Sequence, residues 1–170
     1  MTTVSTTDLV SEAGLISDTG LAASIATGES LYEIDFYAWT QAQGELLRSK
    51  NWAKVDLENV IEEIESLGRQ ERRELVNRLG VLIGHLLKWQ FQSDRRSNSW
   101  LATIREQRIQ VNLLVQENPS LKSYLEQALD TAYDLGVILA VKETGLPFNH
   151  FPDRCPYDFN QILAALFLPD

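Results

Sequence analysis

Hydrophobic residues recur at steps of three and four positions along most of the chain after residue 30, which is the spacing of an amphipathic α-helix. The steps are sustained longest between residues 56 and 91, over about nine helical turns. No stretch shows the persistent two-residue alternation of a half-buried strand. The apolar positions of the long run are Leu57, Val60, Ile61, Ile64, Leu67, Leu75, Leu79, Leu82, Ile83, Leu86 and Trp89. This pattern predicts an all-α fold.

Capping residues mark where the predicted helices begin. Asp35 and Asp56 are good N-cap types directly before apolar-periodic runs, and Ser97 or Ser99 has the same position before a later run. Asn118 followed by proline is another strong start signal, because proline is favoured in the first helical turn. The four main helices are expected near residues 35–50, 56–91, 98–116 and 119–143.

Glycine and proline mark the expected breaks. Gly68 is the one weak position of the long helix predicted over residues 56–91, because glycine costs about 1 kcal/mol relative to alanine in a helix and so tolerates a bend or break there. Gly145 and Pro147 end the fourth helix, and a proline-rich turn then leads to a short terminal helix from about Tyr157. The predicted architecture is a helical bundle of four main helices plus a short C-terminal helix.

The first thirty residues differ from the rest of the chain. They are rich in Ser, Thr, Gly and Ala, which predicts a weakly structured arm over residues 1–30. The chain has 170 residues and 44% hydrophobic composition, which suits one domain with a proper core. We therefore expect a single α-helical domain over residues 31–170.

Composition argues against a membrane, secreted or metal-binding protein. The apolar runs are far shorter than the roughly 18–20 residues that span a bilayer, and the first thirty residues contain no Lys or Arg to start a signal peptide. The lone Cys155 cannot form an internal disulfide or a thiolate metal cluster. These features predict a cytoplasmic protein with no cofactor.

Charge is distributed unevenly. The formal net charge is −9, yet the stretch from Arg69 to Arg108 contains nine Lys or Arg against four acidic residues. An acidic protein repels polyphosphate at long range, so general binding of nucleic acids is not expected. A local basic patch still suits a small anion or an acidic protein surface.

The best candidate for such a patch surrounds the turn between the second and third helices. Arginine heads with backbone N–H groups at a helix start favour an anion. Trp89 and Trp100 flank the same turn, and we expect both to be largely buried in the core, with the arginine heads reaching solvent or acidic partners. The candidate binding residues are Lys88, Arg95, Arg96, Ser97 and Arg105.

Arg78 and His85 form the one candidate catalytic pair. They are two helical turns apart in "RLGVLIGH" and share a helix face, so the Arg can hold a phosphate while the His moves a proton. The outline resembles that of HEPN-type ribonucleases, which cleave RNA without metal. Those enzymes carry a polar residue after the Arg, where this chain has Leu79. The structural alternative is a hydrogen-bonded core histidine.

Two further groups of polar residues have structural explanations. The acids Glu58, Glu62, Glu63 and Glu65 lack the Glu-x-x-His partners of a di-metal bundle and suit a solvated face near a helix N-terminus, so no metal site is expected. His150 and Cys155 lie in the proline-rich turn, where aromatic packing explains the composition better than a nucleophilic pair.

Five motifs in order resemble a known family. They are "LYEIDFYAWTQ", "DLENVIEEIESLGRQERREL", "HLLKWQFQSDRRSNSWLATIREQR", "NPSLKSYLEQALDTAY" and "ETGLPFNHFPDRCPYDFNQIL", and they run from about Leu31 to Leu168. The chain thus resembles the bacterial family called domain of unknown function 29 (DUF29), abundant in cyanobacteria. The resemblance implies a small, all-helical cytoplasmic protein and transfers neither an activity nor catalytic residues.

The expected function follows from the catalytic and ligand-binding motifs that the sequence lacks. With no metal-ligand set, phosphate-binding loop or nucleophile triad, the sequence favours a non-enzymatic interaction module that binds a protein partner or a small anion. The alternative is a metal-independent HEPN-like ribonuclease using Arg78 and His85. The oligomeric state stays open.

Overall fold

The computed structural model describes residues 30–170, and over these residues the protein is all-α, as predicted. No strand occurs among them. The predicted N-terminal arm lies outside the described residues, apart from its last residue. The α-helices are α2 (Leu31–Ile34), α3 (Phe36–Arg48), α4 (Leu57–Phe91), α5 (Asn98–Glu117), α6 (Leu125–Thr144) and α7 (Phe159–Leu163).

The chain divides into two compact units, one ending at Glu65 and the other running from Ser66 to Asp170. Helix α4 contributes its first turns to the first unit and the remainder to the second. The single domain expected over residues 31–170 stays a prediction.

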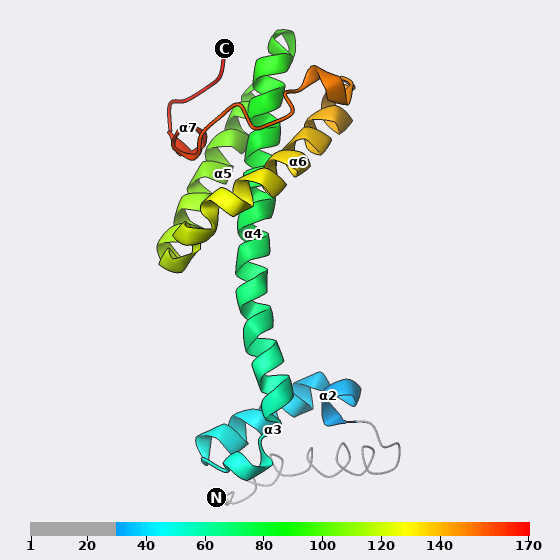
Figure 1. The fold of residues 1–170 in the computed structure, drawn as a ribbon, viewed down its shortest axis with the longest axis vertical. Coiled ribbons are helices and arrows are strands. Elements are labelled where there is room, and N and C mark those ends of the chain that lie inside the picture. The colour runs from blue at the N-terminus through cyan, green and yellow to red at the C-terminus, as the bar shows by residue number, and fades with distance from the viewer. Residues whose placement is uncertain (1–29) are drawn as a thin grey trace, which may run out of the picture. The chain divides into compact units, whose positions relative to one another are not determined.

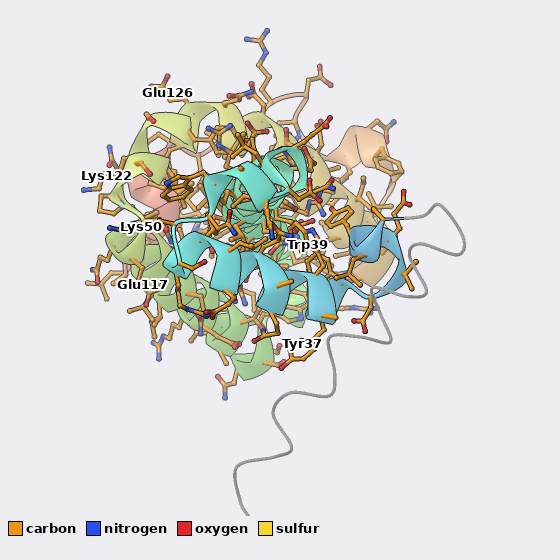
Figure 2. All side chains as sticks on the ribbon, turned by 90° about the horizontal axis from the view of Figure 1, so that it is seen from below. Tyr37, Trp39, Lys50, Glu117, Lys122 and Glu126 are labelled. Carbon is orange, nitrogen blue, oxygen red and sulfur yellow. The ribbon has the colours of Figure 1, made fainter. Side chains whose placement is uncertain are left out.

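In the first unit, Asp56 connects α3 to the start of α4. Its carboxylate accepts hydrogen bonds from the Trp39 indole Nε1 at 3.1 Å and from the Asn59 side chain at 2.8 Å. The Asp56 backbone N–H donates to the Gln43 side chain at 2.9 Å. These bonds turn Trp39 inward, whereas Tyr37 points away on the other side of α3 (Figure 2).

In the second unit, α5 and α6 lie along the later part of α4 (Figure 1). The core consists of the apolar residues of α4 from Leu75 onward, packed against α5, α6 and the C-terminal segment. Ile104 and Val111 from α5 and Ala128 and Ala132 from α6 are fully buried in it. Burying this apolar surface provides most of the stability of such a unit.

The predicted caps are largely confirmed. Asp35 accepts a hydrogen bond from the Ala38 N–H at 2.9 Å, and Ser97 accepts one from the Trp100 N–H at 3.3 Å. The Asp56 carboxylate accepts a hydrogen bond from the Asn59 N–H at 3.4 Å. Gly145 follows α6 in the left-handed conformation at φ 75°, which is the usual glycine position after a helix.

Three details differ from the prediction. Residues Pro119–Tyr124 form a 3₁₀ helix, so α6 begins at Leu125. The Asn118 side chain makes no capping bond to this 3₁₀ helix, and its amide donates to Glu71 and to the Leu114 carbonyl. Helix α4 continues unbroken through Gly68, which agrees with the single helix predicted near residues 56–91, because one glycine costs only about 1 kcal/mol in a helix of 35 residues. The terminal helix α7 begins at Phe159, later than predicted, and Asp158 closes a capping box with Gln161.

Glycine residues allow α4 and α6 to approach closely. A Cβ atom on Gly84 would lie 2.7 Å from Leu139 Cδ2 and 3.0 Å from the Gly136 carbonyl oxygen. A Cβ on Gly136 would in turn lie 3.0 Å from the Gly84 backbone nitrogen. The two backbones therefore meet at this point, with no room for a side chain between them.

Arg108 holds the C-terminal segment on the second unit. It is a buried residue of α5, and its guanidinium donates to the carbonyl oxygens of Ile162 at 2.8 Å, Ala165 at 3.2 Å and Phe167 at 2.6 Å. Burial lowers the pKa of Arg108 from its usual value. These bonds satisfy carbonyls near and beyond the end of α7 that have no helical partner.

The glycine contact generates a matched pair of substitutions. We expect Gly84→Ala to destabilise the protein by about 1–3 kcal/mol, because the added methyl group overpacks the α4–α6 contact. Gly68→Ala places its methyl group in open space and should leave stability unchanged or raise it by up to about 1 kcal/mol. Urea denaturation followed by circular dichroism measures both, and equal effects of the two substitutions would contradict the close approach.

Candidate functional site

Lys88 is the most unusual charged residue of the second unit. Only 1% of it is exposed, and its ammonium group pairs with the Glu143 carboxylate of α6. The same nitrogen lies 4.2 Å from the centroid of the Trp100 ring, in the position of a cation–π contact. An opposite charge and an aromatic face thus compensate for the loss of water around this ammonium group.

From the sequence, Lys88 is a candidate anion- or partner-binding residue, and the structure buries it in an ion pair with Glu143. The reason is geometric: its position on α4 faces α6 one turn beyond the glycine contact.

His85 lies one turn before Lys88 and is also buried. Its Nδ1 atom is 3.0 Å from the Val81 carbonyl oxygen, which is the hydrogen-bonded core histidine considered as the structural alternative. Burial lowers its pKa below the ordinary value of 6.5 and the charge of Lys88 lowers it further, while the Val81 bond and Glu143 act in the opposite direction. The neutral ring is favoured.

Arg78 has a different environment from His85. Its guanidinium pairs with Glu74 one turn earlier, at 2.6 Å, and is partly exposed. One member of the candidate catalytic pair is thus engaged in a local ion pair and the other in the core. The geometry does not direct both side chains toward a shared open site.

The candidate anion-binding residues are not gathered into one charge cluster. Arg96 donates from Nε to the Trp89 carbonyl at 2.8 Å and from Nη2 to the Pro169 carbonyl at 3.4 Å, with its guanidinium 5.1 Å from the Trp89 ring centroid. Ser97 uses its hydroxyl as a helix cap. Arg95 and Arg105 are exposed and have no ion pair among the described residues.

Trp89 and Trp100 are mostly shielded from solvent without being fully buried, in line with the expectation that they lie largely in the core. Trp89 packs against the edge of the core, and Arg96 covers its outer face. Trp100 lies over the Lys88 ammonium group. Each ring thus contacts a cationic group, which explains why neither ring is fully enclosed by apolar side chains.

The other polar groups have structural partners. Glu63 accepts a hydrogen bond from the Tyr32 hydroxyl, and no group of three potential metal ligands occurs within residues 30–170. The Cys155 thiol donates to the Tyr157 carbonyl at 3.3 Å, and burial raises its pKa. His150 is exposed and packs edge-on against Phe91 and Phe151.

The feature that sequence reasoning missed is the exposed apolar surface of the first unit. Among the described residues of this unit, Trp39 is the only buried large apolar side chain. Eight large apolar side chains of this unit are exposed instead, and Leu67, further along α4, is exposed as well. The eight are Ile34, Phe36, Tyr37, Leu47, Trp52, Leu57, Ile61 and Ile64. Periodicity identified most of these positions but did not reveal that they lack a cover.

A shallow apolar groove occurs in the second unit. It has a volume of about 320 Å³ and lies beside the α4–α6 contact. Gly80, Leu135, Ile138 and Leu139 provide most of its wall, with Asn77, Val81 and Lys142. Since the wall offers few polar groups, the groove lacks the convergent hydrogen-bonding groups that orient a small ligand.

None of the helices within residues 30–170 is both long and apolar enough to cross a membrane.

The buried ion pair predicts a non-additive pair of substitutions. Glu143→Gln leaves the Lys88 ammonium group buried without a counter-charge, a change that costs about 3–5 kcal/mol when both partners are fully buried. Because Glu143 is partly exposed, we expect a loss near the lower end of that range. The double variant Lys88→Met/Glu143→Gln should lose less than Glu143→Gln alone, as measured by urea denaturation in a double-mutant cycle. Additive losses would contradict the pairing.

The buried histidine predicts a pH dependence of stability. Because the pKa of His85 is lower in the folded chain, the unfolded chain binds more protons between that pKa and 6.5. The free energy of unfolding therefore rises with pH through this window and falls as the solution is acidified below about pH 6.5. In His85→Gln, the urea midpoint should change less between about pH 7.5 and pH 5.5 than in wild type.

The matched control is His150→Gln, since His150 is the only other histidine and its ring is exposed. This variant should keep the wild-type pH profile. An unchanged profile in His85→Gln would show that His85 is not the source of the dependence.

Comparison with family models matches residues 31–168 to a family described as Domain of unknown function DUF29. A search of curated proteins found no match, and neither did a search of solved structures. The family match spans most of the chain and confirms the resemblance carried by the ordered motifs. This chain belongs to the DUF29 family.

Proposed function

We propose that this protein is a non-enzymatic interaction module that binds a protein partner through the apolar surface of its first unit. The observation that carries the proposal is the imbalance of burial over residues 30–65, the described part of this unit, where one large apolar side chain is buried and eight are exposed. A high number of exposed large apolar side chains is costly in water and is typical of interaction sites. A cytoplasmic location is part of this proposal, in keeping with the lone Cys155.

The residue types on this surface support a protein partner. Phe36, Tyr37 and Trp52 are exposed aromatic side chains, which are enriched at the centres of protein interfaces. Ile61 and Ile64 add an aliphatic row on the first turns of α4, at the spacing by which helices dock into one another.

The other two hypotheses draw less support from the geometry. For a small anion, three of the five candidate residues are engaged elsewhere: Lys88 with Glu143, Arg96 with backbone carbonyls and Ser97 as a helix cap. For the ribonuclease, the His85 ring is buried and Arg78 pairs with Glu74. Binding of a protein to the first unit would leave the contacts of all these side chains unchanged.

The test substitutes the aliphatic row without disturbing the helix. In Ile61→Gln/Ile64→Gln, two exposed apolar side chains become polar ones of good helix propensity, so the fold should persist. We expect binding of the partner captured from the native cell to weaken at least about tenfold, as measured by calorimetry with the purified partner.

Ile109→Gln/Leu113→Gln is the matched control. These two α5 side chains are exposed to a similar degree but lie in the second unit. The control should bind like wild type. Equal loss in both variants, or loss in neither, would contradict a docking surface on the first unit.

A further inference from the structure

The α3–α4 junction, residues 47–57, contains the only basic residues in the described part of the first unit. The three cationic residues of positions 30–65 are Arg48, Lys50 and Lys54, and no acidic residue lies between them. Outside this short run, the described part of the unit carries eight acidic residues and no basic one. Within residues 30–65, the junction is therefore the place that attracts negative charge.

Both lysines of the junction are open to solvent. Lys50 and Lys54 are exposed, and neither makes an ion pair with a described residue. Arg48, in contrast, pairs with Glu45 at 3.0 Å. Figure 2 shows Lys50 at the end of α3 opposite to α2. Two of the three positive charges are thus available to a ligand.

The same junction exposes three large apolar side chains. Leu47 is 36% exposed, Trp52 64% and Leu57 62%. The turn that carries them is compact, because the Asn51 N–H donates to the Leu46 carbonyl at 2.9 Å and the Lys54 N–H donates to the Asn51 carbonyl at 3.1 Å. The junction therefore suits a ligand that is both apolar and acidic.

The N-terminal arm of the same chain has this chemistry. It carries four acidic residues and no Lys or Arg. Asp8 and Glu12 are four positions apart, and Leu9 and Ile16 are seven positions apart. At 3.6 residues per turn, this spacing is typical of a helix with an apolar face that is bordered by acidic residues.

We propose that residues 8–16 dock on the α3–α4 junction of their own chain, with their acidic side chains beside Lys50 and Lys54 and their apolar side chains over Trp52 and its neighbours. The inference rests on the proposed function and adds a regulation to it. The docked segment covers part of the apolar surface through which the protein partner binds, so the partner has to displace it.

The length of the chain permits this docking. Ile16 and Ser30 are 14 positions apart, which spans up to about 45 Å in an extended chain. Helices α2 and α3, which lead from Ser30 to the junction, are together shorter than about 30 Å at 1.5 Å per residue. Because a short tether gives the segment a local concentration in the millimolar range, a weak attraction is enough to hold it.

Charge selects the junction over the rest of the exposed apolar surface. Ile61 and Ile64 on α4 are also exposed, but their neighbours in the sequence are Glu62, Glu63 and Glu65. These carboxylates repel an acidic segment, whereas the lysines of the junction attract it. The isoleucine row therefore stays open to the partner while the junction is covered.

Paramagnetic relaxation enhancement tests the docking in the full chain. A nitroxide is attached at Thr7→Cys in a Cys155→Ser background, where serine keeps the hydrogen bond that the thiol donates to the Tyr157 carbonyl. The Trp52 indole N–H signal of the ¹⁵N-labelled chain should lose most of its intensity, because docking brings residue 7 close to the junction.

Charge reversal shows whether this loss reports on docking. Lys50→Glu/Lys54→Glu and Asp8→Lys/Glu12→Lys each bring like charges together, so each should restore most of the Trp52 signal. The variant with all four substitutions again brings opposite charges together, and its Trp52 signal should be lost as in wild type.

Three controls accompany this series. Lys142→Glu/Arg154→Glu changes the net charge as much as Lys50→Glu/Lys54→Glu, at exposed positions of the second unit, and should keep the wild-type loss. A mixture of nitroxide-labelled ¹⁴N chain with nitroxide-free ¹⁵N chain should show no loss, because the segment docks on its own chain. Far-ultraviolet circular dichroism checks that every variant is as helical as wild type.

Three results would overturn the docking. They are a Trp52 signal of equal intensity in wild type and both double variants, a folded four-substitution variant that keeps full intensity, and a loss in the mixed sample, which would place the segment on a second chain. Once docking is observed, Asp8→Lys/Glu12→Lys should bind the captured partner at least about threefold more tightly, because the segment no longer competes. An unchanged affinity would overturn the competition.

The outcomes separate this inference from the proposed function. If the Trp52 signal shows no docking while Ile61→Gln/Ile64→Gln still abolishes binding of the partner, the proposed function stands and this inference fails. If docking is observed and no partner binding depends on these isoleucines, the docking stands and the proposed function fails.

Discussion

The close backbone contact between α4 and α6 is the constraint on which the second unit depends. Gly80 and Gly84 face Ala132 and Gly136, and a Cβ at either Gly84 or Gly136 would collide with the backbone of the other helix. Gly80 lies against Ala132 and Gly84 against Gly136, so residue numbers increase in the same direction along the two helices. Helices α4 and α6 therefore run in the same direction at this contact. The absence of side chains at the crossing lets the larger neighbours interdigitate on both sides of it.

The buried Lys88 follows from the same contact. One turn beyond Gly84, the two helices are still close enough for the Lys88 ammonium group to reach Glu143 near the end of α6. Trp100, at the start of α5, closes the remaining side. Three helices thus meet at one charge, and the partial burial of Trp100 is a consequence of this arrangement. The ion pair therefore acts as a geometric requirement on α4, α5 and α6 together more than as a large source of stability.

The success of each prediction from the sequence depends on whether the feature is set by nearby residues or by residues far away in the chain. Apolar periodicity and cap residues located most of the helices, because both are local: Asp35, Asp56 and Ser97 cap through neighbours three residues away. The burial of Lys88 was not predictable, because lysine is almost always exposed and its partner is 55 positions away in the sequence. The engagement of Arg96 with Pro169 is likewise long-range.

The exposed row on α4 shows a different limit of sequence reasoning. Ile61 and Ile64 are aliphatic and three residues apart, as are Leu79 and Leu82, which are fully buried. Periodicity shows which face of a helix is apolar but does not show whether another element covers that face. The two halves of α4 differ in the residues that lie beside their apolar positions. The covered half carries Gly80 and Gly84, which admit another helix at backbone distance. In the exposed half the one glycine, Gly68, has no neighbour within 4 Å of the place where a Cβ would lie, so no other helix of the described residues packs there.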